Sequence, residues 1–113
     1  MNINELTLGQ AKELANLFTN KEVSKEHPFQ IGKNYFIRTV TMIQIGKLTA
    51  VYDTELVIVD AVWVADTGRF TDAFKDIENL NEVELFPEGD VIIGRGSIID
   101  ACLWNNKIPE VQK

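Results

Sequence analysis

The sequence has little cysteine, histidine or proline, and these shortages limit what the chain can be. It holds one cysteine, Cys102, one histidine, His27, and three prolines in 113 residues. A single thiol forms no internal disulfide, which argues against the cross-linked framework of small secreted proteins. One thiol and one imidazole are also too few ligands for a zinc site. We therefore expect a reducing, cytoplasmic compartment, no metal, no cofactor, and a Cys102 thiol buried in the apolar run around it.

Long apolar runs and positive charge are also scarce. No stretch approaches the roughly 20 apolar residues that a membrane-spanning helix needs, and Met1–Thr7 lack the basic start of a signal peptide. Seventeen acidic residues against eleven basic ones give a net charge of −6, which repels the phosphate backbone of duplex DNA. The sequence therefore predicts a protein that is neither exported nor membrane-bound and that has no duplex DNA partner.

The residues that are present have the composition of one folded domain, with 45% apolar and 25% charged residues. Thr7 and Gln10 have the spacing of a helix capping box, and an apolar stripe at helical intervals runs from Leu8 to Phe18. We predict a single domain over residues 1–113. Its parts are a helix and linker in 1–33, a small β-barrel in 34–104 and a tail in 105–113.

The middle of the chain is typical of a bent sheet. Apolar side chains fall on both parities of Tyr35–Ile45, which predicts one long strand that bends or changes the face it buries. Gly46-Lys47 then predicts a turn, and Leu48–Tyr52 a second short strand. Leu56–Ala65 is the most apolar segment, so we expect it to form a central strand.

The last third predicts a helical insertion and a closing hairpin. Phe70–Ile77 has helical spacing for about two turns, and the acidic segment Glu78–Asp90 includes a short apolar stretch. Val91–Ile93 and Ile98–Trp104 are joined by Gly94–Ser97, whose paired glycines favour a tight hairpin. The predicted fold class is α+β: an N-terminal helix and a strongly bent five-stranded antiparallel small barrel, Sm-like or SH3-like, with a short helical insertion between strands 3 and 4.

Two segments resemble the signatures of Sm-like proteins. Gly46-Lys47-Leu48, followed by Asp53 and the apolar Leu56–Ala61, resembles the first signature, and Val91–Ile99, with its Arg-Gly turn, resembles the second. In that family a five-stranded barrel lies behind an N-terminal helix, edge strands join subunits into rings, and the two turns form a pocket for RNA bases. The resemblance implies a homo-oligomeric ring with Asp53 and Arg95–Ser97 at its ligand pocket.

A second resemblance covers most of residues 33–113. Asp60–Phe70, Phe86–Gly89 and Gly94–Trp104 are similar to an uncharacterised family of small proteins from phages, prophages and bacteria. The resemblance implies a phage or mobile-element accessory protein in the cytoplasm of a bacterium or an infected host. Small phage proteins of this kind can sequester host signalling nucleotides, so host takeover or anti-defence is the implied role.

Arginines and a tryptophan extend the candidate ligand site. Each arginine beside a predicted turn can make bidentate contacts with phosphate, and a tryptophan can stack on a base. The same tryptophan in a strand also suits a core or interface position. The predicted ligand-binding residues are Arg38, Asp53, Trp63, Asp66, Arg69, Arg95, Gly96 and Ser97.

Three aspartates in or beside apolar strands raise the possibility of a hydrolase. Asp60, Asp66 and Asp100 would hold Mg²⁺ if they converged. An aspartate in a strand more often bonds a turn, caps a helix or pairs with an arginine, and the sequence has neither a phosphate-binding glycine loop nor a supported nucleophile. We therefore predict no catalytic residues and no enzyme activity.

Three functions follow from these patterns. The first is a non-enzymatic oligomeric binding protein that holds a nucleotide, a short RNA or another anionic ligand at subunit junctions. The alternative is an acidic protein that binds a host protein, either as an enzyme inhibitor or as a virion accessory factor, through Glu78–Asp90 and the short predicted helix at Phe70–Ile77. The third is a metal-dependent hydrolase that uses Asp60, Asp66 and Asp100.

Overall fold

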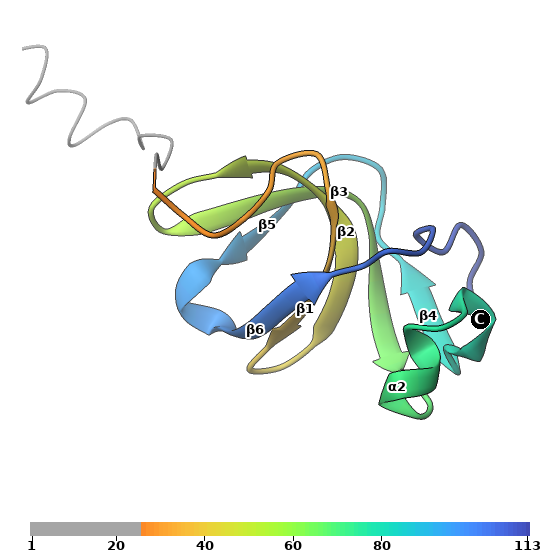
Figure 1. Cartoon of the computed structure of the whole chain (residues 1–113). Coiled ribbons are helices and arrows are strands. Elements are labelled where there is room, and N and C mark those ends of the chain that lie inside the picture. Colours follow the sequence, from red (N-terminus) through yellow and green to blue (C-terminus); the bar gives the residue numbers. More distant parts are fainter. Residues whose placement is uncertain (1–25) are drawn as a thin grey trace, which may run out of the picture.

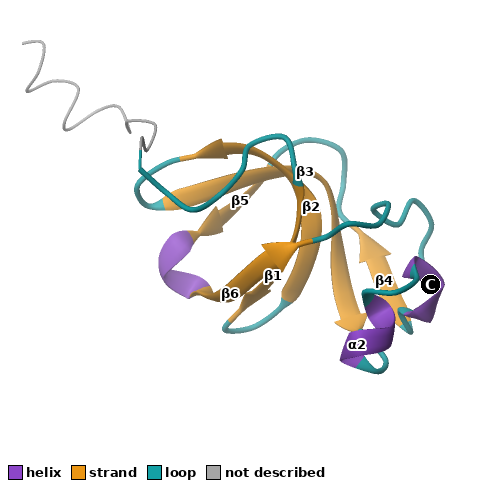
Figure 2. Cartoon of the chain, in the orientation of Figure 1, coloured by secondary structure: helices purple, strands orange, loops and turns teal. Residues whose placement is uncertain are grey.

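A computed structural model describes residues 26–113, and this part of the chain is built almost entirely of β-strands (Figures 1 and 2). The predicted α+β class with a five-stranded barrel is wrong, because the described residues form six antiparallel strands and a single α-helix of four residues. The predicted N-terminal helix lies outside the described residues. No helix in the described part is long and apolar enough to cross a membrane.

The six strands form one sheet in the order β4-β3-β2-β1-β6, and β5 also pairs with β3. Because β5 and β4 share one side of β3, the long strand changes partner along its length. The elements are β1 (Asn34–Thr39), β2 (Ile43–Val51), β3 (Glu55–Asp66), α2 (Phe70–Ala73), η2 (Ile77–Asn79), β4 (Glu82–Leu85), β5 (Val91–Gly94), η3 (Arg95–Ser97) and β6 (Ile98–Leu103).

The sheet curls because its two far strands are neighbours in the chain. β5 pairs with the first half of β3, whereas β6 pairs with β1. The strands β3, β2 and β1 therefore lie between β5 and β6 in the sheet. Only the three-residue turn η3 separates β5 from β6, so the sheet has to bend round to bring them together (Figure 1). The result is a small, β-rich, barrel-like domain.

Asp60 is where β3 changes the face that it buries. Leu56 and Ile58 pack in one core, whereas Val62 and Val64, which have the same parity, pack in another. A strand of strict alternation cannot do this, so one residue must be added between them. Asp60 is that residue: its φ is 54°, and the pairing with β2 shifts register opposite it.

The two cores lie on opposite faces of the sheet. The first fills the inside of the curl and includes Tyr35, Ile37 and Leu48. The second lies on the outer face, where Phe36 and Trp104 pack with Phe74 from the segment after α2. The insertion between β3 and β4 therefore covers the outer face of β1 and β2.

The first two strands begin and end at residues other than those predicted. The turn lies at Val40–Met42, where the Thr39 hydroxyl donates to the Met42 carbonyl at 2.9 Å and accepts from the Met42 amide at 3.0 Å. Gly46 lies inside β2 rather than in a turn. A Cβ at this position would be 2.7 Å from Ile58 Cδ1, which explains why the residue is a glycine. This glycine lets the Ile58 side chain pack against the backbone of β2.

The helical insertion and the closing hairpin also differ from the prediction. The helix ends early because Asp76 is extended and its carboxylate accepts from the Glu78 amide, which starts the separate turn η2. β5 and β6 do not pair with each other, and neither Gly94 nor Gly96 has a positive φ. The predicted tight hairpin is replaced by a 3₁₀ turn that is held by other parts of the fold.

The C-terminal segment after Leu103 packs against the outer core. Lys113 exchanges two backbone hydrogen bonds of 2.9 Å with Val83, which covers the free edge of β4. Trp104 is buried, and its indole N–H donates to the Lys107 carbonyl at 2.9 Å.

The predicted central strand is confirmed, since β3 lies between β2 and both β4 and β5.

We expect the bulge at Asp60 to depend on its left-handed backbone. Asp60→Gly relieves the steric cost of this conformation and should change the free energy of unfolding by less than about 0.5 kcal/mol. Asp60→Val puts a β-branched residue there and should destabilise the fold by about 1–3 kcal/mol. Urea unfolding followed by circular dichroism measures both. Equal stability of the two variants would contradict this role for the bulge.

Candidate functional site

The eight residues predicted to bind a ligand fall into separate groups. Asp53 and Arg95–Ser97 lie together at one end of β3, because the Arg95 amide donates to the Thr54 carbonyl at 2.9 Å. Asp66 and Arg69 lie at the other end of β3, between that strand and α2. Trp63 lies in the half of β3 that pairs with β4. Arg38 lies in β1 and contacts Phe70 of α2.

The η3 turn is joined to the β2–β3 turn by Arg95. Its guanidinium Nη1 donates to the Tyr52 carbonyl at 2.9 Å, and its Cζ lies 5.7 Å from the centre of the Phe29 ring. The Ser97 hydroxyl donates to the Gly94 carbonyl at 2.7 Å, which closes the 3₁₀ turn. The two turns that carry the Sm-like resemblance are therefore adjacent in space. Arg95 is half-buried, and its bond to Tyr52 uses one of the five N–H donors of the guanidinium.

Arg38 forms a two-pronged ion pair with Asp100 across β1 and β6. Arg38 Nε donates to one carboxylate oxygen of Asp100 at 2.7 Å, and Nη2 donates to the other. The hydrogen bond from Arg38, opposed by partial desolvation, lowers the pKa of Asp100. The same hydrogen bond raises the pKa of Arg38. The pair is about half exposed, and it occupies the fork that a phosphate would need.

Asp66 bonds its own turn rather than a ligand. Its carboxylate accepts from the Gly68 amide at 2.8 Å, and its carbonyl accepts from the Asn81 amide at 3.0 Å. Gly68 has a φ of 67°, and a Cβ there would be 2.9 Å from the Asn79 carbonyl oxygen. Arg69 is exposed at the start of α2. These residues shape the turn that leads into α2.

The three aspartates of the hydrolase hypothesis do not converge. Asp60 lies in the bulge, Asp66 bonds its turn, and Asp100 pairs with Arg38. Within residues 26–113, no group of three or more histidine, cysteine, aspartate or glutamate side chains could hold a metal ion. Cys102 is exposed on β6, so the prediction of a buried thiol is wrong. Partial burial, together with the charge of Asp100, raises the pKa of Cys102.

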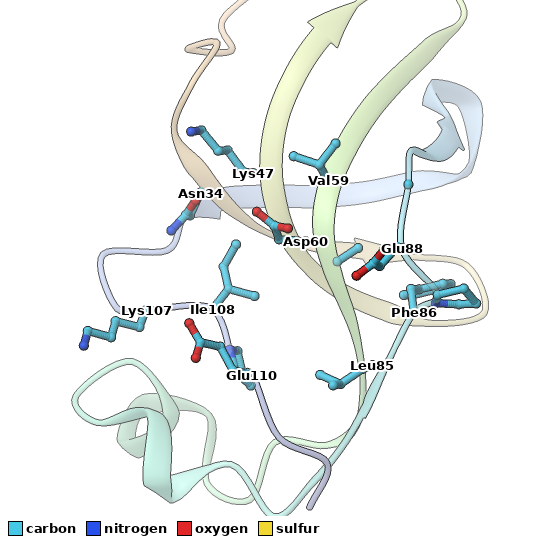
Figure 3. A pocket seen from close by; sticks show the side chains of 14 residues that line it. Asn34, Lys47, Val59, Asp60, Leu85, Phe86, Glu88, Lys107, Ile108 and Glu110 are labelled. Atoms are coloured by element: carbon cyan, nitrogen blue, oxygen red, sulfur yellow. The ribbon is translucent and has the colours of Figure 1, made fainter.

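A groove beside the bulge is a feature that the sequence did not predict. Its volume is about 910 Å³, and its floor is the stretch of β3 between the end of β5 pairing and the start of β4 pairing. Figure 3 shows Asp60 and Glu88 pointing into it, while Lys47 and Lys107 extend outward on the other side. We call it the Asp60 groove; its walls are Asn34, Lys47, Val59, Ala61, Leu85–Gly89 and Lys107–Glu110.

β5 and β6 each have one edge that no described residue covers. β5 pairs with β3 alone, and β6 pairs with β1 alone. Ile92 and Ile99, one on each strand, are both 67% exposed, and Val40, whose amide bonds the Ser97 carbonyl at 2.9 Å, is 71% exposed. Proline and lysine, which often protect an edge, occur in neither strand. These are the sheet edges most open to another chain.

Comparison of the chain with protein-family models, curated protein sequences and solved structures returns no match. The two family resemblances drawn from the sequence therefore stay predictions, and the function has to be argued from this chain's own residues.

We expect the Arg38–Asp100 pair to control how Asp100 titrates. In Arg38→Met, which keeps an apolar stem beside Phe70, the pKa of Asp100 should rise toward its ordinary value. Because Arg38 lowers the folded-state pKa, the pair stabilises the fold at neutral pH, and this contribution is lost as the pH falls through that pKa. Carboxyl-carbon NMR titration measures the change. An unchanged Asp100 titration in the variant would show that the pair has no effect on it.

Proposed function

We propose that this chain is a non-enzymatic binding protein whose copies join head to tail through β5 and β6 and hold an anionic ligand at the junction. The observation that carries the proposal is the pair of uncovered strand edges joined by η3. A strand edge with unpaired N–H and C=O groups is a template for another strand. Head-to-tail contacts give a ring when the rotation from each copy to the next brings the last copy back to the first.

The composition of the two edges supports pairing between copies. Each has an exposed isoleucine, and the one charged residue in β5 and β6, Asp100, is already bound by Arg38. A strand edge kept apart from other chains usually carries unpaired charge or proline. By contrast, the edge of β4 is covered by the chain's own Lys113. Among residues 26–113, therefore, one edge is covered by the chain itself and the outer edges of β5 and β6 have no strand partner.

The ligand part of the proposal rests on Arg95. It lies on the turn between the two uncovered strands, beside the turn that carries Asp53. One of its nitrogens bonds the Tyr52 carbonyl, which fixes the direction of the guanidinium while other donors stay available. A fixed guanidinium at a junction suits a phosphate or carboxylate group. Ligands of this class include a nucleotide or a short RNA.

The oligomer is tested by placing charge on the edges. We expect the full chain to be an oligomer by size-exclusion chromatography with light scattering. Ile92→Lys and Ile99→Lys should each shift it toward the monomer, because a lysine on an edge opposes strand pairing. Both side chains are 67% exposed, so the fold should tolerate the change.

The matched control is Val111→Lys, since Val111 is 76% exposed and lies on the C-terminal segment, outside β5 and β6. It should leave the oligomer unchanged. A wild-type chain that is monomeric at every concentration measured would reject assembly through these edges. Equal dissociation by all three variants would instead trace the effect to net charge.

The ligand is tested by calorimetry with AMP and with hexauridylate. We expect saturable binding to the full chain and at least about tenfold weaker binding to Arg95→Met, because a charged hydrogen bond is worth roughly 1.5–3 kcal/mol. Thermal unfolding of the variant, measured in parallel, separates loss of the contact with Tyr52 from loss of ligand binding. No heat of binding at millimolar concentration of either probe would reject the anionic ligand.

A second candidate function is recognition of a basic partner protein by the acidic part of the chain. Glu82, Glu84, Glu88 and Asp90 are all exposed on β4 and the loop that follows it. The helix that was expected to dock in a partner's groove is only four residues long, and its Phe70 packs against Phe36 and Phe74. The exposed carboxylates are therefore the observation that favours this alternative.

A further inference from the structure

The Asp60 groove contains charges of both signs that do not pair with one another. Its charged lining residues are Lys47, Asp60, Glu88, Lys107 and Glu110. Within residues 26–113, no ion pair joins any of these side chains to another. Opposite charges that line one groove and stay apart are available to a ligand that carries both.

The groove is accessible, and its charges are separated across it. Lys47, Asp60 and Glu88 are all exposed, so a ligand can reach them from solvent. Figure 3 shows Lys47 and Lys107 on one side, Glu88 on the opposite side and Asp60 between them. Glu110 lies on the lysine side, where two lysines against one glutamate leave a net positive charge. The opposite side, with Asp60 and Glu88, is negative.

Three strands and a loop determine how long the groove is. Asn34 pairs with Lys47, and Lys47 pairs with Val59, so these side chains share one face of β1, β2 and β3. The Phe86 amide donates to the Ala61 carbonyl at 3.1 Å, which holds the loop after β4 beside β3. Neighbouring strands lie about 4.8 Å apart, so three such steps span about 14 Å along the sheet. An extended chain of four residues has about the same length.

The space between the charged groups is apolar and large enough for such a chain. The apolar lining consists of Val59, Ala61, Leu85, Phe86, Pro87, Ile108 and Pro109. The volume of about 910 Å³ is near the upper end of the range for small-ligand pockets, which is roughly 300–1,000 Å³. A single amino acid would leave most of this space empty.

We infer that the Asp60 groove binds a short free peptide, of three or four residues, by its two charged ends. The amino end lies at Asp60 and Glu88, whose carboxylates accept from its ammonium group. The carboxylate end lies at Lys47 and Lys107, which donate to it. The Asn34 amide, on the same side, supplies a further donor. Side chains in the middle of the peptide contact the apolar lining.

Other ligand classes match only part of the groove. A phosphate or a lone carboxylate meets the two lysines but is repelled by Asp60 and Glu88. A polyamine meets these carboxylates but places a second positive charge beside Lys47 and Lys107. An uncharged apolar ligand takes water from the charged groups and gives them no partner in return, which is unfavourable. A ligand with one charge of each sign matches both sides.

This site is separate from the proposed junction between copies. None of the residues that line the groove belongs to β5, η3 or β6. The inference does not depend on assembly or on an anionic ligand at Arg95. Its failure would therefore leave the proposal for β5 and β6 untouched.

The test follows backbone amide signals of the full chain by nitrogen-15 NMR during titration with tetraalanine at neutral pH. We expect the signals of Val59, Ala61 and Gly89 to shift saturably at millimolar peptide. The signals of Ile92 and Ile99, on β5 and β6, should stay in place. Acetylating the amino end or amidating the carboxyl end removes one charge, and each change should weaken binding at least about threefold. The doubly blocked peptide should bind most weakly.

Two variants assign the ends of the peptide to the sides of the groove. Asp60→Asn removes the charge and keeps the bulge, because asparagine also adopts a positive φ readily. It should weaken binding of tetraalanine about threefold and leave binding of the acetylated peptide unchanged. Lys47→Gln should weaken binding of tetraalanine by a similar factor and leave binding of the amidated peptide unchanged. Neither should change the melting temperature, since both side chains are exposed.

The matched controls are Glu84→Gln and Lys33→Gln, which remove the same charges from exposed residues outside the groove. Both should leave every affinity unchanged. If Asp60→Asn lowers the melting temperature, Glu88→Gln on the exposed loop takes its place with the same expectation.

Several results would overturn the inference. One is the absence of any saturable shift with tetraalanine. Another is equal affinity for the free and the doubly blocked peptide. An amidated peptide that binds as tightly as the free one would assign the groove to a cation alone. Equal losses in the groove variants and in their controls would trace the effect to net charge.

Discussion

The fold depends on one constraint, which is that β3 has to serve two cores on opposite faces of the sheet. When the side chains of a strand alternate strictly, all residues of the same parity face the same core. The extra residue Asp60 is what lets Ile58 and Val62 face different cores. The insertion also bends the strand, as bulges do. This residue thus lets β3 line the inner core with its first half and the outer core, which the α2 insertion covers, with its second half. The positive φ is tolerated because aspartate adopts this region more readily than bulkier residues.

The bulge also determines where the sheet stops pairing. β5 runs beside β3 up to Ile58, and β4 begins beside Val62, so the side of β3 between them opens into the Asp60 groove. β5 joins β3 only beyond the groove and runs from Val91, opposite Ile58, to Gly94, opposite Glu55. The η3 turn, at that far end, then carries the chain to β6 without a ladder between the two strands. The sharing of β3 between β5 and β4 extends the inner face of β3 beyond the curl, where Trp63 is partly exposed.

The sequence predicted elements better than partnerships. The central strand and the start of β structure near residue 34 were predictable from apolar runs, because those runs depend on local composition. The change of face was anticipated, but in Tyr35–Ile45 rather than at Asp60, since parity alone does not tell a bulge from a turn. The roles of Arg38 and Gly46 were not predictable, because each depends on a side chain distant in sequence, Asp100 and Ile58 respectively.

Two arginines of this acidic chain help to hold the fold together. Arg38 joins β1 to β6, and Arg95 joins η3 to the β2–β3 turn, so both have part of their hydrogen-bonding capacity occupied within the chain. The carboxylates of β4, by contrast, face solvent, and such a surface favours cationic partners. The backbone edges of β5 and β6 are different, because each strand edge offers donors and acceptors in alternation and so matches another strand. The two surfaces therefore favour two different classes of partner.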